Sequence, residues 1–255
     1  MKRILILKTG DTARDVSAAH GDYDRWFTDA IPRPGLEFEI RDVTRGAEPE
    51  PPELPARRAD GVAGIIVTGS VSAAYRAEPW MPPLERFLSQ AESWGRPVLC
   101  VCFGAQLLAH ARGGKVILNP AGWEIGSALM HQTDAALRDP LMAGLPREFR
   151  ALATHEDRIE RLPAGCVLLA GNDNSPVQAF RATARVWGVQ FHPEATAAII
   201  DKLIRLRADN LTRDAAAHGL AAEGHVERLL GTLRQPGIDQ GRRVLDNFVR
   251  ICLGE

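Results

Sequence analysis

The chain has 255 residues, with 31 Lys and Arg against 32 Asp and Glu, 45% hydrophobic residues and only 6% aromatics. This length is enough for one large α/β domain. The formal net charge of -1 gives no excess of basic residues, so we expect no nucleic-acid partner. The apolar runs are too short for a membrane span or for a secretory signal. We therefore expect no membrane association and a cytoplasmic location.

Four cysteines are spread along the chain without a C-x-x-C pair: Cys100, Cys102, Cys166 and Cys252. This number and spacing exclude a disulfide scaffold and a zinc ribbon. The sequence also lacks a P-loop, a G-x-G-x-x-G pattern and any metal-ligand spacing. We expect neither a metal nor a cofactor, and any cysteine chemistry should be nucleophilic.

Short apolar runs alternate with helical patterns over most of the chain. The runs predict strands over residues 3–7, 36–41, 62–67, 97–101, 166–170, 177–180 and 186–191, and helices are expected over residues 81–94 and 104–112. A proline-rich segment, Glu48–Pro55, is expected to be a surface connection. The alternation predicts a doubly wound, mostly parallel α/β sheet with ligands beyond the carboxyl ends of its strands.

The end of the chain has a helical pattern throughout. Apolar residues recur three or four residues apart in three places: Ile199, Ile200, Leu203 and Ile204, then Val226, Leu229 and Leu230, then Val244, Leu245, Phe248 and Val249. Three exposed faces of this kind would promote association. We therefore predict a domain over residues 1–197 and a helical C-terminal extension over residues 198–255, buried mainly against that domain, with a modest self-association surface as the alternative.

The first chemical motif is the stretch from Pro97 to Ala109, which contains Cys102, Gly104 and Gln106. A buried strand ends at Val101 and a helix begins near Gly104, so Cys102 is expected in the tight turn between them. Such an elbow exposes its side chain above the sheet and directs the free N–H groups of the helix toward it. This environment favours the reactive thiolate.

The second motif comes ninety residues later, where the sequence Gly-Val-Gln-Phe ends in His192, Pro193 and Glu194. In extended backbone, residues two apart point the same way, so the carboxylate of Glu194 can accept a hydrogen bond from the imidazole of His192. Cys102, His192 and Glu194 then supply the nucleophile, base and orienting acid for acyl transfer through a thioester.

At these residues the chain resembles the class I (triad) glutamine amidotransferases, and it is most similar to the free-standing type that resembles the glutaminase portion of GMP synthase. The resemblance joins the C-x-G-x-Q elbow to the late H-P-E and extends over about residues 1–196. It includes residues 65–70, which look like the family's oxyanion loop, together with residues 122–126 and 154–157.

The resemblance also implies roles for residues around the nucleophile. Backbone N–H groups at Ser70 and Phe103 would form the oxyanion hole. The substrate-binding residues would be Gly69, Gln106, His155 and Asp157. The chain departs from the family at two positions: Ser70 and Val71 stand where a second Gly and a Pro are common, and Cys100 stands where a Gly is frequent.

The resemblance implies hydrolysis of the side-chain amide of glutamine to glutamate and ammonia, with a synthetase or a second copy of the chain as the alternative partners. A γ-glutamyl hydrolase or peptidase with the same triad is the nearest alternative. A catalytically idle binding or regulatory module is the other. The acceptor of the ammonia is left open by the sequence.

Overall fold

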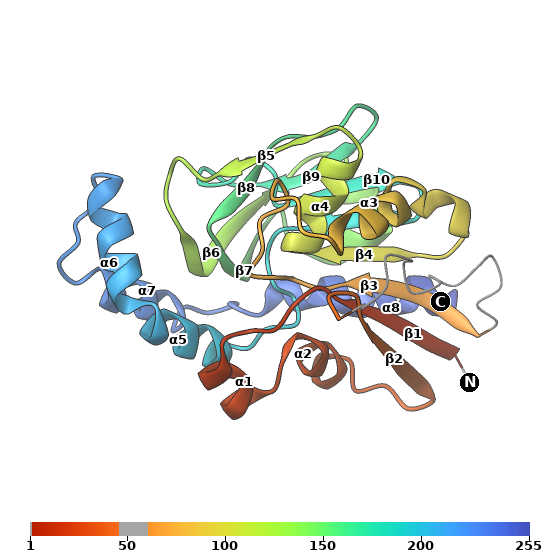
Figure 1. The fold of residues 1–255 in the computed structure, drawn as a ribbon, viewed down its shortest axis with the longest axis horizontal. Coiled ribbons are helices and arrows are strands. Elements are labelled where there is room, and N and C mark those ends of the chain that lie inside the picture. Colours follow the sequence, from red (N-terminus) through yellow and green to blue (C-terminus); the bar gives the residue numbers. More distant parts are fainter. Residues whose placement is uncertain (1, 46–60) are drawn as a thin grey trace.

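The structure is a computed structural model that describes residues 2–45 and 61–255 (Figure 1). The connection predicted at Glu48–Pro55 lies outside the described residues. The strands are β1 (Lys2–Lys8), β2 (Leu36–Asp42), β3 (Val62–Val67), β4 (Val98–Val101), β5 (Lys115–Leu118), β6 (Glu124–Gln132), β7 (Glu148–His155), β8 (Asp157–Arg161), β9 (Val167–Gly171), β10 (Ala179–Thr183) and β11 (Val186–Val189). The α-helices are α1 (Arg14–His20), α2 (Tyr23–Ala30), α3 (Met81–Ser89), α4 (Phe103–Ala111), α5 (Ala197–Leu206), α6 (Ala208–Ala217), α7 (His225–Thr232) and α8 (Arg243–Leu253).

Nine of the strands form one sheet in the order β2-β1-β3-β4-β11-β10-β9-β6-β7. The first five run parallel to one another, and the remaining four continue the sheet in antiparallel pairs. Strands β5 and β8 form a separate two-stranded sheet. The predicted α/β class and the parallel core of the sheet are confirmed. The carboxyl ends of β3, β4 and β11 therefore meet at one edge, where ligands of such folds bind.

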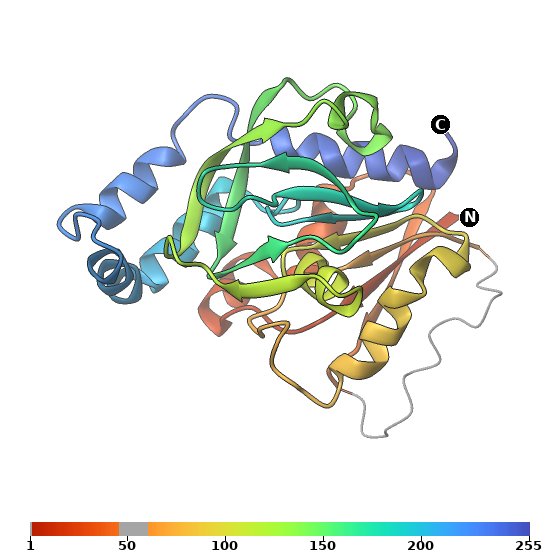
Figure 2. The same ribbon diagram turned by 90° about the horizontal axis from the view of Figure 1, so that it is seen from above.

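Helices cover both faces of the parallel strands, because the buried apolar side chains of β1 point alternately to the two faces. Ile4 and Ile6 pack with α2 and α8 on one face, whereas Leu5 and Leu7 pack with α3 and α4 on the other. Figure 2 shows α8 lying along the sheet, and the side chain of Lys2 donates to the carbonyl of Leu253 at 2.6 Å. The two ends of the chain are thus side by side.

Several predicted elements end elsewhere in the structure. The strand expected to reach Phe191 stops at Val189, because the chain leaves the sheet where its neighbour β4 ends and the N–H of His192 donates instead to the carbonyl of Leu152 at 2.7 Å. The helix expected over residues 81–94 ends at Ser89 and is followed by a separate 3₁₀ turn, Ala91–Trp94. The strand expected over residues 177–180 is shifted toward the C-terminus.

The C-terminal helices contribute to the core unequally. Val244, Leu245 and Phe248 of α8 are fully buried against the sheet. The apolar residues of α5 are buried in a second cluster with α1 and α2. Helix α7 has no fully buried residue, so its predicted apolar face is only partly covered. The division of the chain at residue 197 stays a prediction. Among residues 2–45 and 61–255, no helix is long and apolar enough to cross a membrane.

Candidate active site

Cys102 lies in the turn between β4 and α4, with φ 52° and ψ −109°. It is the sole non-glycine residue with a positive φ in the described part of the chain. A non-glycine residue holds this conformation only where its surroundings impose it, and such strain clusters at functional sites. Gly104 contributes to the constraint, because a Cβ there would lie 2.8 Å from the carbonyl oxygen of Val67. The predicted elbow is therefore present, with the first helical residue one position earlier than expected.

His192 and Glu194 form a buried pair in the loop after β11. Nδ1 of His192 lies 2.7 Å from Oε1 of Glu194, and the two residues are 3% and 1% exposed. Burial lowers the pKa of His192, but the charges of Glu194 and Cys102 outweigh it and raise the pKa to about 10. The other ring nitrogen, Nε2, has no hydrogen-bond partner among the described residues. It is therefore available to the thiol of Cys102.

Gly69 lies between the nucleophile and the imidazole. A Cβ at this position would be 3.1 Å from Cε1 of His192 and 3.6 Å from Cβ of Cys102. The first approach is tighter than an ordinary contact and the second is an ordinary van der Waals contact, so the absence of a Cβ leaves room for the imidazole. The contact also places the side chains of Cys102 and His192 on the same side of the β3 loop.

The two predicted oxyanion donors are the backbone N–H groups of Phe103, which follows Cys102 in the chain, and of Ser70, which lies in the loop after β3. Phe103 is the first residue of α4, so its backbone N–H has no partner within the helix. Ser70 lines the pocket beside Cys102, and its Oγ accepts from the backbone N–H of Ser72 at 3.1 Å. Ser70 does not have a positive φ. The departure from glycine at this position therefore carries no left-handed backbone strain.

The amide of Gln106 is buried and engaged by the protein itself. Its Nε2 donates to the carbonyl of Asp157 at 3.1 Å and to Oε1 of Gln190 at 3.2 Å. The carboxylate of Asp157 accepts from the hydroxyl of Tyr75 at 2.9 Å, and burial raises its pKa. Gln106 and Asp157 both line the pocket and form part of its wall.

His155 joins the pocket to a polar network that the sequence does not reveal. Its Nδ1 lies 2.9 Å from the carbonyl oxygen of Asp157, and its Nε2 lies 3.1 Å from Oε2 of Glu124. The carboxylate of Glu124 also accepts from Asn172 at 2.6 Å and from Gln178 at 2.8 Å. Burial raises the pKa of Glu124, but His155 and the hydrogen bonds of Asn172 and Ser175 more than offset this and lower it. The network fixes the orientation of the imidazole.

A pocket of about 130 Å³ brings these residues together with others from distant parts of the chain. Six of the predicted residues line it: Ser70, Cys102, Gln106, His155, Asp157 and His192. The predicted residues Gly69, Phe103 and Glu194 do not line it, and Glu194 lies behind the imidazole of His192. The sequence motifs do not identify Tyr23, Trp26, Leu203 and Arg207 as pocket residues, whereas Trp123, which also lines the pocket, lies within the matching stretch 122–126. These four residues lie outside the motifs, and they reach the pocket through the packing of α2 and α5.

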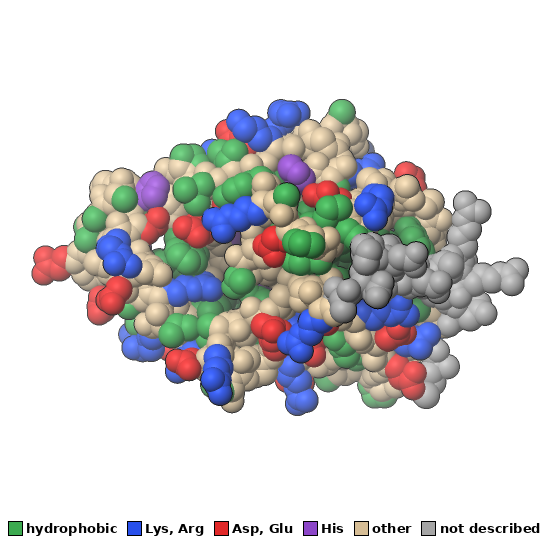
Figure 3. Space-filling model, in the orientation of Figure 1, with side chains coloured by type: hydrophobic (Ala, Val, Ile, Leu, Met, Phe, Trp, Pro, Cys, Tyr) green, Lys and Arg blue, Asp and Glu red, His purple; other side chains and the backbone are tan. Residues whose placement is uncertain are grey.

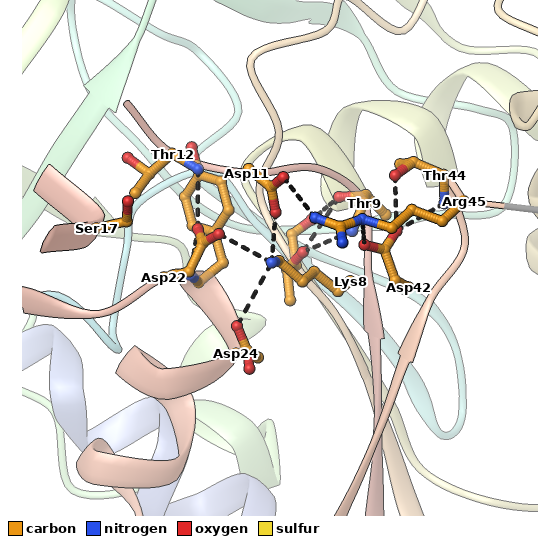
Figure 4. A network of polar contacts seen from close by, with 12 residues as sticks. Lys8, Thr9, Asp11, Thr12, Ser17, Asp22, Asp24, Asp42, Thr44 and Arg45 are labelled. Carbon is orange, nitrogen blue, oxygen red and sulfur yellow. Dashed lines mark hydrogen bonds and ion pairs between the residues drawn. The ribbon is translucent and has the colours of Figure 1, made fainter. Parts of the chain in front are cut away.

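The wall formed by α2 is held by a charged network at the end of β1 (Figure 4). Nζ of Lys8 lies 2.8 Å from Oδ2 of Asp22, and it also contacts Asp11 and Asp24. Burial lowers the pKa of Lys8, but Asp11 and Asp22 raise it to about 12, so the ammonium stays charged. Asp22 also caps α2 by accepting from the N–H of Tyr23 at 2.8 Å. The network thus positions the first turn of α2 at the pocket.

The described residues contain no group of three or more His, Cys, Asp or Glu side chains that could hold a metal ion. On the face drawn in Figure 3, basic and acidic side chains are interspersed with apolar ones. A cysteine at a strand-to-helix elbow, beside a buried pair of imidazole and carboxylate, is the arrangement that cysteine-dependent acyl-transfer sites use.

The comparisons with known proteins agree with this class of site. The model of the family Glutamine amidotransferase class-I matches residues 22–205, and the chain belongs to this family. The chain is 36% identical over 173 residues to the glutamine-hydrolyzing GMP synthase of Thermomicrobium roseum, a match that covers 68% of this chain and 31% of that enzyme. It is 26% identical over 209 residues to Gamma-glutamyl peptidase 5 of Arabidopsis thaliana, which covers 80% of this chain and 81% of the peptidase.

Solved structures share the fold at low sequence identity. A glutamine amidotransferase from Thermotoga maritima superimposes with a TM-score of 0.72 at 18% identity, over 98% of both chains. A glutamine amido transferase from Methylobacillus flagellatus gives 0.71 at 22% identity, over 98% of this chain and 94% of the other. The chain spans 24–31% of the length of the GMP synthases it matches. The matches therefore establish the family of the chain. The synthesis of GMP is a property of those longer enzymes.

Proposed function

We propose that the chain hydrolyses the side-chain amide of glutamine, with Cys102 as the nucleophile. The observation that carries this proposal is the pairing of a strained elbow cysteine with an imidazole whose second nitrogen is held 2.7 Å from a buried carboxylate. A buried carboxylate behind the imidazole stabilises the imidazolium that forms during acyl transfer. Membership of a glutamine amidotransferase family supplies the substrate class.

In the first half of the reaction, Nε2 of His192 takes the thiol proton of Cys102, and Sγ attacks the γ-carbonyl carbon of glutamine. The N–H groups at Ser70 and Phe103 stabilise the charge that develops on the former amide oxygen. His192 then gives its proton to the departing nitrogen, the carbon–nitrogen bond breaks, and ammonia leaves a thioester on Cys102. Glu194 keeps the imidazole oriented throughout.

In the second half, His192 takes a proton from water, and the resulting hydroxide attacks the thioester carbonyl. The carbon–sulfur bond breaks, glutamate forms, and the proton returns to the Cys102–His192 pair. Water is the sole co-reactant. A synthetase that consumes the ammonia, as in the GMP synthases that the chain resembles, is the partner we propose, with a second copy of the chain as the alternative. The cytoplasmic location stays a prediction.

A γ-glutamyl peptidase is the second candidate, and one observation favours it. The match to Gamma-glutamyl peptidase 5 covers 81% of that protein, whereas the matches to GMP synthases cover 24–31% of theirs. Hydrolysis of a γ-glutamyl peptide uses the same thioester, with an amino acid or peptide as the leaving group in place of ammonia. An idle binding module has no need for the buried pair of His192 and Glu194, which argues against it.

The test is turnover of a substrate panel by the purified chain. L-glutamine, γ-glutamyl dipeptides and glutathione are incubated with the protein, and glutamate, ammonia and the released amine are quantified. The glutaminase proposal predicts the highest kcat/KM for glutamine. A preference for γ-glutamyl peptides would favour the peptidase, and no turnover of any compound would contradict both.

A further inference from the structure

A guanidinium faces the pocket that holds Cys102, in addition to the imidazole of His192. Arg207 follows the last residue of α5 and lines the pocket together with Cys102 and His192. Its guanidinium carbon lies 5.0 Å from the centre of the Trp123 ring, and Nη1 donates to Oγ1 of Thr154 at 2.8 Å. Stacking and one hydrogen bond thus orient the guanidinium plane.

No carboxylate within the described part of the chain forms an ion pair with this cation, although the charge of Glu156 acts on it from a greater distance. The ion pairs among those residues do not include Arg207, and its side chain donates a single hydrogen bond to them. A guanidinium has five N–H donors arranged as a fork that matches a carboxylate. Burial lowers the pKa of Arg207, because desolvation disfavours the cation. A largely desolvated cation without a direct ion pair is costly, and an anion that enters the pocket would reduce that cost.

The same pocket also contains acidic side chains. Glu156 and Asp157 both line it, and the pKa of each is raised by burial. The charges of Asp157 and Asp214 raise the pKa of Glu156 further, whereas the charge of Arg207 lowers it. A pocket of about 130 Å³ with two carboxylates and a guanidinium that forms no direct ion pair has the charges that a small zwitterion needs.

We propose that Arg207 binds the α-carboxylate of the substrate's γ-glutamyl unit, while Glu156 and Asp157 bind its α-ammonium. The proposal rests on the proposed function and narrows its substrate class. The chain would act on a γ-glutamyl unit with both α-groups free, and it would reject a glutamine residue inside a polypeptide, since that residue has no α-carboxylate. The family match ends at residue 205, so Arg207 lies just beyond it.

The test compares two substrates that differ only at the α-carboxylate. L-glutamine carries the carboxylate, and L-glutamine α-amide has a neutral amide in its place. The substitution Arg207→Gln should lower kcat/KM for glutamine by about 10- to 100-fold, mainly through KM, because a charge-assisted bidentate contact is lost. The rate with the α-amide should change less than threefold, and Arg207→Lys should restore part of the loss.

Arg205→Gln is the matched control, because Arg205 lies two residues away on α5 and is exposed and paired with Asp201. It should leave both substrates unaffected. Equal losses on glutamine and its α-amide in Arg207→Gln would overturn the proposal, as would no loss on either. Thermal unfolding of each variant identifies a loss that comes from misfolding.

A binding measurement separates this proposal from the proposed function. L-glutamate, the expected product, is titrated calorimetrically into Cys102→Ala protein, which has no nucleophile. The subsite predicts binding that Arg207→Gln weakens at least tenfold and Arg205→Gln does not. If glutamate binding depends on Arg207 but the wild-type chain does not hydrolyse glutamine, the subsite proposal is supported and the catalytic proposal is contradicted. If the wild-type chain hydrolyses glutamine but Arg207→Gln does not change glutamate binding, the catalytic proposal is supported and the subsite proposal is contradicted.

Discussion

The backbone N–H of Cys102 donates to the carbonyl of Val189 at 2.8 Å. This bond ties the nucleophile's turn to the last residue of β11, three residues before His192. The parallel pairing of β4 with β11 aligns Val101 with Val189, so both chains leave the sheet at the same level. Two motifs ninety residues apart in the sequence therefore meet because their strands are neighbours in the sheet.

The pairing of His192 with Glu194 makes the first prediction. Glu194→Gln keeps the shape of the side chain but removes the charge that supports the imidazolium. We expect kcat to fall by about 10²- to 10⁴-fold with little change in thermal stability. Glu148→Gln is the control, because Glu148 is an exposed carboxylate on β7 near a different histidine, His131. An unchanged kcat in Glu194→Gln would mean that another group orients His192.

The space at Gly69 makes the second prediction. In Gly69→Ala the new methyl group would lie 3.1 Å from Cε1 of His192 and would push the imidazole away from Cys102. We expect kcat to fall by about 10- to 100-fold, because small misplacements of reacting groups are costly. Gly231→Ala is the control: no atom lies within 4 Å of the added Cβ, and the site is in helix α7. That change should leave activity intact. Full activity in Gly69→Ala would show that the site tolerates a wider spacing.

The raised pKa of His192 predicts how stability depends on pH. An unfolded histidine has a pKa of about 6.5, whereas in the folded chain the pKa of His192 is raised to about 10. The folded state binds the proton of His192 more tightly than the unfolded state does. The contribution of this protonation to the free energy of unfolding is therefore fully present below pH 6.5, and it is lost as the pH rises toward 10. Urea unfolding of wild type and His192→Gln at a series of pH values measures it. The stability difference between the two proteins should shrink over that range, and a constant difference would refute the assignment.

The last helix makes a prediction about stability. Phe248 of α8 is fully buried in the core that this helix forms with the sheet. Phe248→Ala should lower the free energy of unfolding by about 3–5 kcal/mol, while Leu220→Ala, at a site 51% exposed, should change it little. Deleting residues 198–255 would expose this face of the sheet, so we expect aggregated protein. A truncated chain that stays monomeric and fully active would contradict the role of α8 in the core.

The sequence predicts those parts of the site that lie in local motifs. Cys102 and the pair of His192 and Glu194 each depend on a few consecutive residues at the end of a strand, where residue type and spacing are informative. The strand ends at Val189 and not Phe191, because the neighbouring strand determines where pairing stops. Sequence periodicity carries no information about that neighbour.

The rest of the pocket depends on packing over long range. Tyr23 and Trp26 read as ordinary apolar residues, and they reach the site because Asp22 and Lys8 fix the start of α2. Arg207 lies in the apolar C-terminal pattern and is directed into the pocket by its contacts with Trp123 and Thr154. No spacing rule relates these residues to the triad motifs.

Selective covalent labelling tests the central claim most directly. Burial raises the pKa of the thiols of Cys100 and Cys166, and that of Cys252 to about 12, so these three should stay protonated and unreactive at neutral pH. Only Cys102 lines the pocket. A chloroketone analogue of glutamine should give one adduct by mass spectrometry, located at Cys102, absent in Cys102→Ala and slowed by excess glutamine. An adduct centred on Cys100 or Cys166, or labelling that glutamine does not slow, would contradict Cys102 as the nucleophile of a γ-glutamyl hydrolase.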